Sequence, residues 1–186
     1  MDAIFHQFMG LEPGDAALTF NLTNANSEVG GDEVSLSDIV SESGAIVVFE
    51  CNHCPYVIGN IERMEKMASR AREYGLGFVG INANDAVNYP DDSFENMQKR
   101  STDMSYSYLH DESQEVAEQW GAERTPEFYL LNGKSEVVYR GRLDNSPNNP
   151  TKATTSELME AMDTMLMGDK PIVERTRSIG CSIKWK

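Results

Sequence analysis

Residues 45–55 of the chain read AIVVFECNHCP, and the prediction of the fold starts here. The first six of these residues are mostly apolar and include β-branched side chains, which is typical of a buried strand. From residue 55 to residue 74, apolar side chains recur at three- and four-residue steps, which predicts one amphipathic helix ended by Gly75. Residues 76–81, LGFVGI, predict a second buried strand. Strand, helix and strand at this spacing form a βαβ unit, in which we expect the two strands to be parallel.

Further strand and helix patterns flank this unit on both sides. Residues 18–22 and 34–36, separated by Gly30-Gly31, predict an N-terminal β-hairpin, and residues 127–131 and 136–140, joined by Asn132-Gly133, predict a second hairpin. Between the unit and the second hairpin we expect a loop over residues 82–92, a helix over 93–100 and a strand over 106–109. Capping-box patterns at residues 111–114 and 154–157 predict the starts of two more helices, and residues 172–186 form a tail.

Length and composition limit the class of protein. The chain has 186 residues, which fits one domain, and we expect a single α/β domain with a mixed sheet over residues 1–186. The longest aliphatic and aromatic run covers residues 45–49, far short of the roughly 20 residues that a membrane span needs. The first ten residues contain no Lys or Arg, unlike a secretory signal. We therefore expect a soluble cytoplasmic protein. Its net charge of −14 argues against nucleic acid or an anionic membrane as a partner.

Cys51 and Cys54 lie three positions apart where the predicted strand meets the predicted helix. Two thiols at this separation can close a small disulfide ring. The free N–H groups and partial positive charge of a helix N-terminus stabilise a thiolate, and His53 adds a positive or hydrogen-bonding group. We expect thiol–disulfide exchange in which Cys51 attacks, because it lies nearer to solvent, and Cys54 resolves the mixed disulfide. The helix begins either at Pro55, with Cys54 as its cap residue, or earlier, with Cys51 as the cap.

The same cysteines also have other interpretations. A CxxC pair can be inert and buried, and it can also bind a metal. A zinc site would need two further ligands, and the remaining cysteine and histidines, Cys181, His6 and His110, stand at distant positions. The position of the pair inside a βαβ unit favours redox chemistry. The sequence contains no phosphate-binding or dinucleotide-binding motif, so we expect no cofactor and no resident metal.

The order of these motifs resembles the thioredoxin superfamily. The strand-CxxC-helix-strand unit is followed by RTPEF at residues 124–128, a hairpin and a last helix. The chain is most similar to the peroxiredoxin-like, redoxin-domain (AhpC/TSA-type) group. The features of that group recur as FECNHCPYV at residues 49–57, TPE at 125–127, YRGR at 139–142 and GCSIKW at 180–185.

The resemblance implies a thioredoxin fold, with a mixed central sheet flanked by helices, an N-terminal β-hairpin, an insertion around residues 82–104 and a C-terminal tail. It also implies a cis peptide bond before Pro126, and a role for Thr125 in offering backbone groups to an extended substrate segment. The implied partners are protein or small-molecule thiols and disulfides, including a thioredoxin-type reductant, and the oligomeric state is open.

Two departures from the pattern bear on activity. Val48 occupies the place of the buried carboxylate that thioredoxins carry, so Glu50 or His53 would have to accept the proton of the second thiol. Peroxiredoxins have a Thr or Ser three residues before the peroxide-reducing cysteine, and here Val48 precedes Cys51 by that distance. We therefore predict a thiol–disulfide oxidoreductase. A thiol peroxidase with an antioxidant role is the rival enzyme, and a metal-binding or interaction module is the third interpretation.

Smaller signals concern the C-terminal part of the chain. Cys181 is either a third redox thiol that folds back near the CxxC pair or a small buried residue beneath Trp185, and plain packing is favoured. Arg140 and Arg142 alternate on one predicted strand, so we expect both on one face, at a solvated edge.

Overall fold

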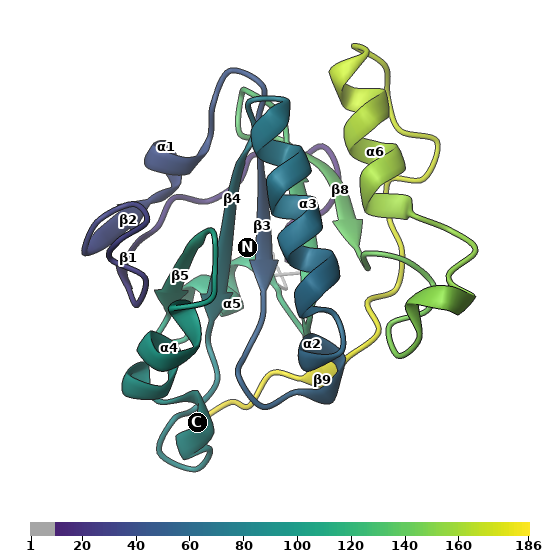
Figure 1. The fold of residues 1–186 in the computed structure, drawn as a ribbon. Helices are drawn as coiled ribbons and strands as arrows, with labels where there is room; N and C mark the ends of the chain where they lie inside the picture. The colour runs from purple at the N-terminus through teal and green to yellow at the C-terminus, as the bar shows by residue number, and fades with distance from the viewer. Residues whose placement is uncertain (1–9) are drawn as a thin grey trace, which may run out of the picture.

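The structure is a computed structural model that describes residues 10–186; predictions about the first nine residues lie outside it. In this range a seven-stranded mixed sheet forms the centre of the molecule (Figure 1). Its strands, in order across the sheet, are β2 (Glu33–Ser35), β1 (Asn21–Asn24), β5 (Ser107–His110), β4 (Gly77–Asn82), β3 (Ala45–Phe49), β7 (Glu127–Leu131) and β8 (Val137–Gly141). A separate pair joins β6 (Arg124–Thr125) to β9 (Cys181–Ser182).

The register confirms the predicted βαβ unit and both hairpins. Strand β3 is parallel to β4 and antiparallel to β7, and β4 is parallel to β5. The N-terminal hairpin pairs β1 with β2, and the second hairpin pairs β7 with β8. Residues 82–104, predicted as an insertion, hold the short helix η1 (Pro90–Asp92) and α4 (Phe94–Ser101), and they connect the parallel strands β4 and β5.

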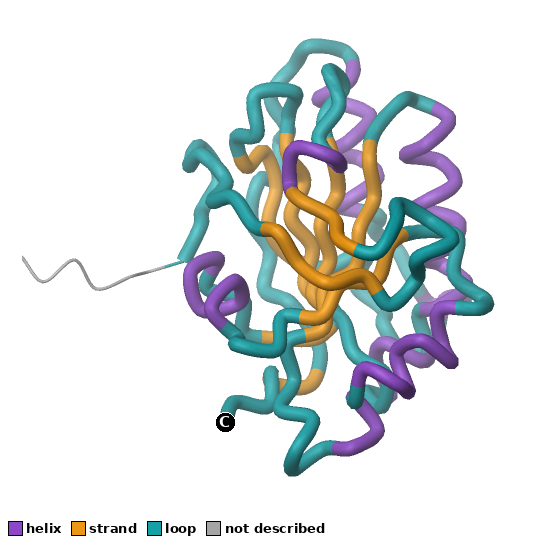
Figure 2. The backbone as a smooth tube through the Cα atoms, turned by 90° about the vertical axis from the view of Figure 1, so that its left-hand side faces the viewer, coloured by secondary structure: helices purple, strands orange, loops and turns teal. Residues whose placement is uncertain are grey.

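Helices cover both faces of the sheet (Figure 2). Because side chains of a strand alternate between faces, Ile46 and Val48 pack with α3 (Ile61–Glu73), α4 and α6 (Glu157–Leu166). Val47 and Phe49 point to the other face, where they pack with α1 (Leu36–Ile39) and α5 (Glu115–Trp120). A short 3-10 turn, η2 (Pro150–Lys152), precedes α6. None of the helices in residues 10–186 has the length and apolar character needed to cross a membrane.

The prediction of one helix over residues 55–74 is wrong. The segment forms α2 (Pro55–Ile58) and then α3, with a break at Gly59 and Asn60. The buried Asn60 side chain donates hydrogen bonds to the carbonyl oxygens of Tyr56 at 2.5 Å and Pro147 at 3.0 Å. It satisfies a carbonyl at the end of α2 and ties the break to a distant loop. The apolar periodicity continues across such a break, so the sequence pattern does not reveal where one helix ends and the next begins.

Both predicted capping boxes are also wrong. Helix α5 follows Gln114, which has a positive φ of 69° and makes no side-chain cap, whereas Asp111 accepts a hydrogen bond from the N–H of Ala117 at 2.8 Å. Helix α6 follows Ser156, and the carboxylate of Glu157 instead forms an ion pair with Arg142. In both places the side chain predicted to cap the helix, Asp111 or Glu157, binds a partner outside the four residues of the predicted capping box.

Candidate redox site

The two cysteines of the CxxC motif lie between β3 and α2, as predicted. Cys51 follows the end of β3, and Cys54 is the N-cap residue of α2 with Pro55 in the first helical turn. A proline is tolerated there because the N–H group that it lacks would have no partner within the helix. The helix therefore begins at Pro55 and not earlier.

Both thiols are shielded from solvent. Cys51 and Cys54 are each 0% exposed, so the prediction that Cys51 lies nearer to solvent is wrong. The physical reason is that residues from β6, the Asp92 loop and the C-terminal tail pack over the junction between β3 and α2. Both sulfurs belong to the apolar cluster on the α3 side of the sheet.

The two thiols of the reduced pair differ in the direction of their pKa shifts. A hydrogen bond from Cys51 is the largest cause that lowers the pKa of Cys54, and hydrogen bonds from Cys181 and Thr125 lower it further, against the opposite effect of burial. The same hydrogen bond, together with burial and the charge of Asp92, raises the pKa of Cys51. These directions favour a thiolate on Cys54, whereas the sequence predicts that Cys51 attacks; which of the two cysteines attacks stays a prediction.

Thr125 contacts both cysteines, and the Thr125–Pro126 peptide bond is cis, as the resemblance implied. The hydroxyl Oγ1 of Thr125 lies 3.5 Å from Sγ of Cys51, and its carbonyl oxygen lies 3.2 Å from Sγ of Cys54. The Cys54 thiol donates to that carbonyl when it is protonated. The structure therefore brings the predicted site residues Cys51, Cys54, Thr125 and Pro126 together.

Asp92 is a site residue that the sequence analysis missed. Its buried carboxylate lies 2.5 Å from Nδ1 of His53 and accepts hydrogen bonds from the Asn52 N–H at 2.6 Å and from the side chains of Asn82 and Asn84 at 3.3 and 2.8 Å. The His53 ring stacks on Tyr89 at 5.7 Å between centroids. The polar run NYPDD at residues 88–92 was a signal for a turn only, because a partner 39 residues away is not visible in sequence.

Ligand atoms of Cys51, His53 and Asp92 lie within 4.8 Å of one another, which makes the group a candidate metal site. Four donors from the protein already engage the Asp92 carboxylate, one of them the His53 ring. A metal would have to displace these contacts and find a fourth ligand. The hydrogen bonds fit a carboxylate that orients the imidazole beside Cys51 better than they fit a metal centre.

We expect replacement of Asp92 by asparagine to destabilise the protein by about 1–3 kcal/mol, because an amide NH₂ would face donors that now share a carboxylate. Urea unfolding of the reduced protein would measure the loss of free energy. Asp91→Asn is the matched control, since the Asp91 side chain is exposed, and we expect a change within about 0.5 kcal/mol. Equal losses in the two variants would contradict the role assigned to Asp92.

Glu50, one of the proposed substitutes for the missing buried carboxylate, is already engaged. It is fully buried, forms an ion pair with Arg100 and accepts a hydrogen bond from the Tyr106 hydroxyl at 3.0 Å. Arg100 also donates to the carbonyl oxygen of Cys51 at 2.7 Å, so the pair supports the backbone of the motif. The His53–Asp92 pair, within 4.8 Å of the Cys51 sulfur, is the remaining candidate acceptor of a thiol proton.

Arg140 and Arg142 are placed differently from the prediction. Arg140 is buried on β8 and pairs with Glu127 at 2.9 Å. Arg142 lies beyond the end of β8 and pairs with Glu157. The two arginines do not form a solvated edge, because each is held by a carboxylate from another element.

Cys181 lies at the redox site and not simply beneath Trp185. It packs against the cluster that holds Cys51 and Cys54, and its backbone is opposite Thr125, which contacts both of them.

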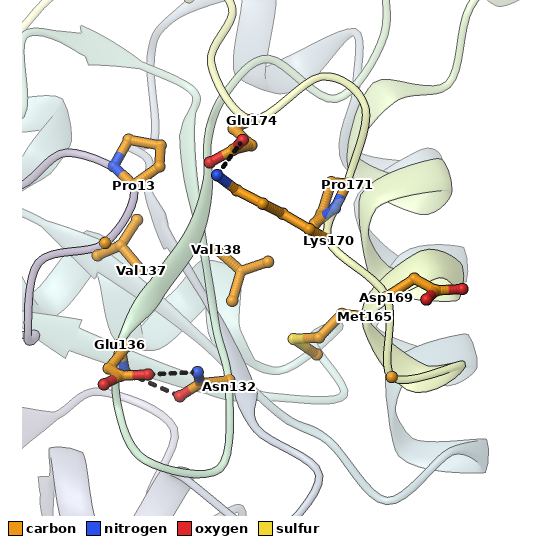
Figure 3. Close-up of a pocket in the computed structure, with 12 residues that line it drawn as sticks. Pro13, Asn132, Glu136, Val137, Val138, Met165, Asp169, Lys170, Pro171 and Glu174 are labelled. Carbon is orange, nitrogen blue, oxygen red and sulfur yellow. Dashed lines mark hydrogen bonds and ion pairs between the residues drawn. The ribbon is translucent and has the colours of Figure 1, made fainter.

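The hollow drawn in Figure 3 is remote from the cysteines. It lies between the start of β8 and the turn after α6, has a volume of about 420 Å³, and none of the three cysteines lines it. Four of its polar side chains form two pairs: Lys170 with Glu174 at 3.0 Å, and Asn132 with Glu136 at 2.8 Å. We assign it no chemistry.

Comparison with known proteins gives a family match and structural neighbours. A model described as the AhpC/TSA family matches residues 13–141. The crystal structure of an uncharacterized conserved protein from Geobacillus kaustophilus is 40% identical, with 96% of this chain and 94% of that chain covered and a TM-score of 0.88. A search of curated proteins found no match.

Two more distant structures show the fold. The thioredoxin domain of a thiol-disulfide oxidoreductase from Bacteroides vulgatus is 16% identical, with 76% of this chain and 96% of that chain covered and a TM-score of 0.58. Peroxidoxin BcpB from Mycobacterium tuberculosis is 15% identical, with 85% and 97% covered and a TM-score of 0.59. These likenesses confirm the predicted thioredoxin fold.

Proposed function

Because the chain belongs to the AhpC/TSA family, we propose that it is a thiol–disulfide oxidoreductase that works through Cys51 and Cys54. One observation carries this proposal: two buried thiols lie at a strand-to-helix junction and both contact Thr125. The lowered pKa of Cys54 favours an ionised sulfur near neutral pH, and the thiolate is the nucleophile of disulfide exchange.

The exchange follows from the arrangement of the two thiols. The Cys54 thiolate attacks a disulfide, one substrate sulfur leaves as a thiolate, and a mixed disulfide forms. Cys51 then loses its proton, attacks the sulfur of Cys54 and releases the second substrate sulfur, so the substrate disulfide is reduced while the dithiol is oxidised. The imidazole of His53, whose Nδ1 contacts Asp92, is the proposed acceptor of the Cys51 proton, because its ligand atom lies within 4.8 Å of the Cys51 sulfur. The proposed partners are protein or small-molecule thiols and disulfides, with a thioredoxin-type protein as a reductant.

A redox titration in a glutathione buffer, read by thiol alkylation and mass spectrometry, tests the proposal. We expect a reversible two-electron transition in which Cys51 and Cys54 join in a disulfide. Cys54→Ser should abolish that transition, and Cys181→Ser should retain it. If no Cys51–Cys54 disulfide forms at any glutathione ratio, the exchange mechanism is wrong. Zinc retained by the purified protein and lost in Cys54→Ser would then favour the metal-binding interpretation.

A thiol peroxidase is the second candidate, and one observation favours it. The sequence has no hydroxyl three residues before Cys51, but the Thr125 hydroxyl lies 3.5 Å from the sulfur of Cys51 and could take part in orienting a peroxide. Hydrogen peroxide added to the reduced Cys54→Ser variant, followed by dimedone labelling, distinguishes the candidates. A sulfenic acid on Cys51 together with peroxide consumption by the native protein supports the peroxidase. Unlabelled Cys51 with unconsumed peroxide excludes it.

A further inference from the structure

The C-terminal tail crosses the redox site as a strand. Residues Cys181–Ser182 form β9, which pairs antiparallel with β6, so that Cys181 is opposite Thr125 and Ser182 is opposite Arg124. Figure 1 shows the yellow tail running beneath α2, where β9 lies. The resemblance implied that the backbone of Thr125 receives an extended substrate segment. In this structure a segment of the chain itself occupies that position.

The contact between the tail and β6 needs a glycine. A Cβ atom at Gly180 would lie 2.1 Å from the carbonyl oxygen of Thr125 and 2.7 Å from its carbonyl carbon. Both are backbone atoms, so they cannot move aside as the end of a flexible side chain could. Gly180 therefore lets the tail approach the Thr125–Pro126 bond closely enough to bring Cys181 to Cys54.

The tail is also anchored beyond the site. Ile183 is buried in the cluster on the α5 side of the sheet, and its N–H donates to the carbonyl oxygen of Glu123 at 3.1 Å. The backbone of Lys184 is held on both sides, because its N–H donates to Asn84 at 2.9 Å and its carbonyl oxygen accepts from Gln114 at 2.9 Å. These bonds hold β9 in one register over the cysteines.

Cys181 differs from the other two cysteines in exposure. Cys51 and Cys54 are fully buried, whereas Cys181 is partly exposed and packs against the cluster that contains both of them. Within residues 10–186, it is therefore the thiol that both touches the buried pair and reaches solvent. Both Cys51 and Cys181 act on the pKa of the Cys54 thiol, so Cys54 is the member of the buried pair that Cys181 is expected to attack.

We propose that Cys181 is a third redox thiol that links the buried Cys51–Cys54 pair to external thiols, with β9 acting as a tethered substrate strand. This inference rests on the proposed function of the pair. The Cys181 thiolate attacks the sulfur of Cys54 in the Cys51–Cys54 disulfide, a Cys54–Cys181 bond forms, and Cys51 leaves as a thiolate that takes up a proton. An external thiolate then attacks Cys181 and releases the Cys54 thiolate. A second external thiol displaces Cys181, and the two external thiols leave as a disulfide.

The charges around Cys181 favour this direction once the pair is oxidised. Burial and the ionised Cys54 raise the pKa of Cys181 to about 11, whereas Lys184 and Arg124 act to lower it. When Cys54 is part of a disulfide, its negative charge is gone and the two cations remain. The Cys181 thiol therefore ionises more readily in the state in which it has to attack.

The Cys51→Ser variant tests the relay, because it leaves Cys54 and Cys181 as the pair in contact. After equilibration in glutathione buffer, alkylation and peptide mass spectrometry should find an intramolecular Cys54–Cys181 disulfide. Adding Gly180→Ala keeps both thiols but pushes the tail away from Thr125. It should lower the ratio of this disulfide to its dithiol by about tenfold or more, because it reduces the effective concentration of the Cys181 thiol at Cys54. Adding Ser182→Ala instead should leave the ratio unchanged, because Ser182 is exposed and only Lys184 donates to its hydroxyl.

The reduction rate in the otherwise native protein gives a second measurement. The Cys181→Ser variant should still form the Cys51–Cys54 disulfide. Glutathione should reduce that disulfide at least about tenfold more slowly than in the native protein, because the buried disulfide lacks the exposed Cys181 thiol. Only glutathione adducts on Cys54 in Cys51→Ser, or equal reduction rates with and without Cys181, would overturn the relay and leave the proposed function intact. Absence of the Cys51–Cys54 disulfide from the native protein would instead overturn the proposed function itself.

Discussion

Cys51→Ala is expected to raise the lowered pKa of the Cys54 thiol towards its ordinary value, by about one to two pH units. The Cys51 thiol makes the strongest of the hydrogen bonds to Cys54, and a bond to a charged group contributes about 1.5–3 kcal/mol. A methyl group in its place cannot donate. Burial favours the neutral Cys54 thiol, and without the hydrogen bond from Cys51 its effect raises the pKa of Cys54.

Thiolate absorbance near 240 nm, followed against pH in the reduced protein, measures this change. The native protein should keep its absorbance as pH falls through neutrality and lose it only as pH approaches the lowered pKa. The loss should occur at higher pH in Cys51→Ala. Cys54→Ala is the control and should remove the signal below pH 8, because burial still raises the pKa values of Cys51 and Cys181 after the contribution of Cys54 to both is lost. A low-pH thiolate that persists in Cys54→Ala would return the attacking role to Cys51.

The second large effect is expected at Arg140, far from the sulfur atoms. Arg140→Met should cost about 3–5 kcal/mol of the free energy of unfolding, because it leaves the Glu127 carboxylate charged and buried without its partner. Arg140 and Glu127 are 3% and 2% exposed, and Arg140 also donates to the carbonyl oxygens of Leu11 and Gly121. Glu127 in turn accepts hydrogen bonds from the N–H groups of Glu123 and Arg124, just before the Thr125–Pro126 bond.

Urea unfolding of the reduced protein, with the dependence on urea concentration unchanged, would measure this loss. Arg142→Met is the matched control from the same motif. Arg142 is more exposed, so removing it should cost less, and Glu157 keeps a hydrogen bond from the Thr155 hydroxyl. Equal losses in the two variants would show that burial of the Arg140–Glu127 pair is not the source of the effect. Arg140→Met should also loosen the segment that carries Thr125, because Glu127 binds the N–H groups of Glu123 and Arg124.

Much of the fold could be predicted because it depends on patterns within single elements. The apolar run of β3, the period of α3 and the alternation in both hairpins depend on residues close together in the chain. The position of Cys51 and Cys54 at the end of β3 and start of α2 follows from the same patterns. Errors arose where a distant group competes with a local one. Asn60 breaks the helix by bonding to Pro147, and Arg142 draws Glu157 away from a cap.

By itself the sequence determined a βαβ unit with two cysteines at its strand-to-helix junction, because hydrophobic period and residue spacing act locally. The tertiary structure alone decided which groups surround those cysteines. Asp92 reaches His53 from the loop after β4, Arg140 is buried by its pairing with Glu127, and Cys181 reaches Cys54 because β9 pairs with β6. Each of these contacts joins residues far apart in the chain. Packing brings such residues together, and no local pattern encodes their distance, their burial or the charge that each thiol carries.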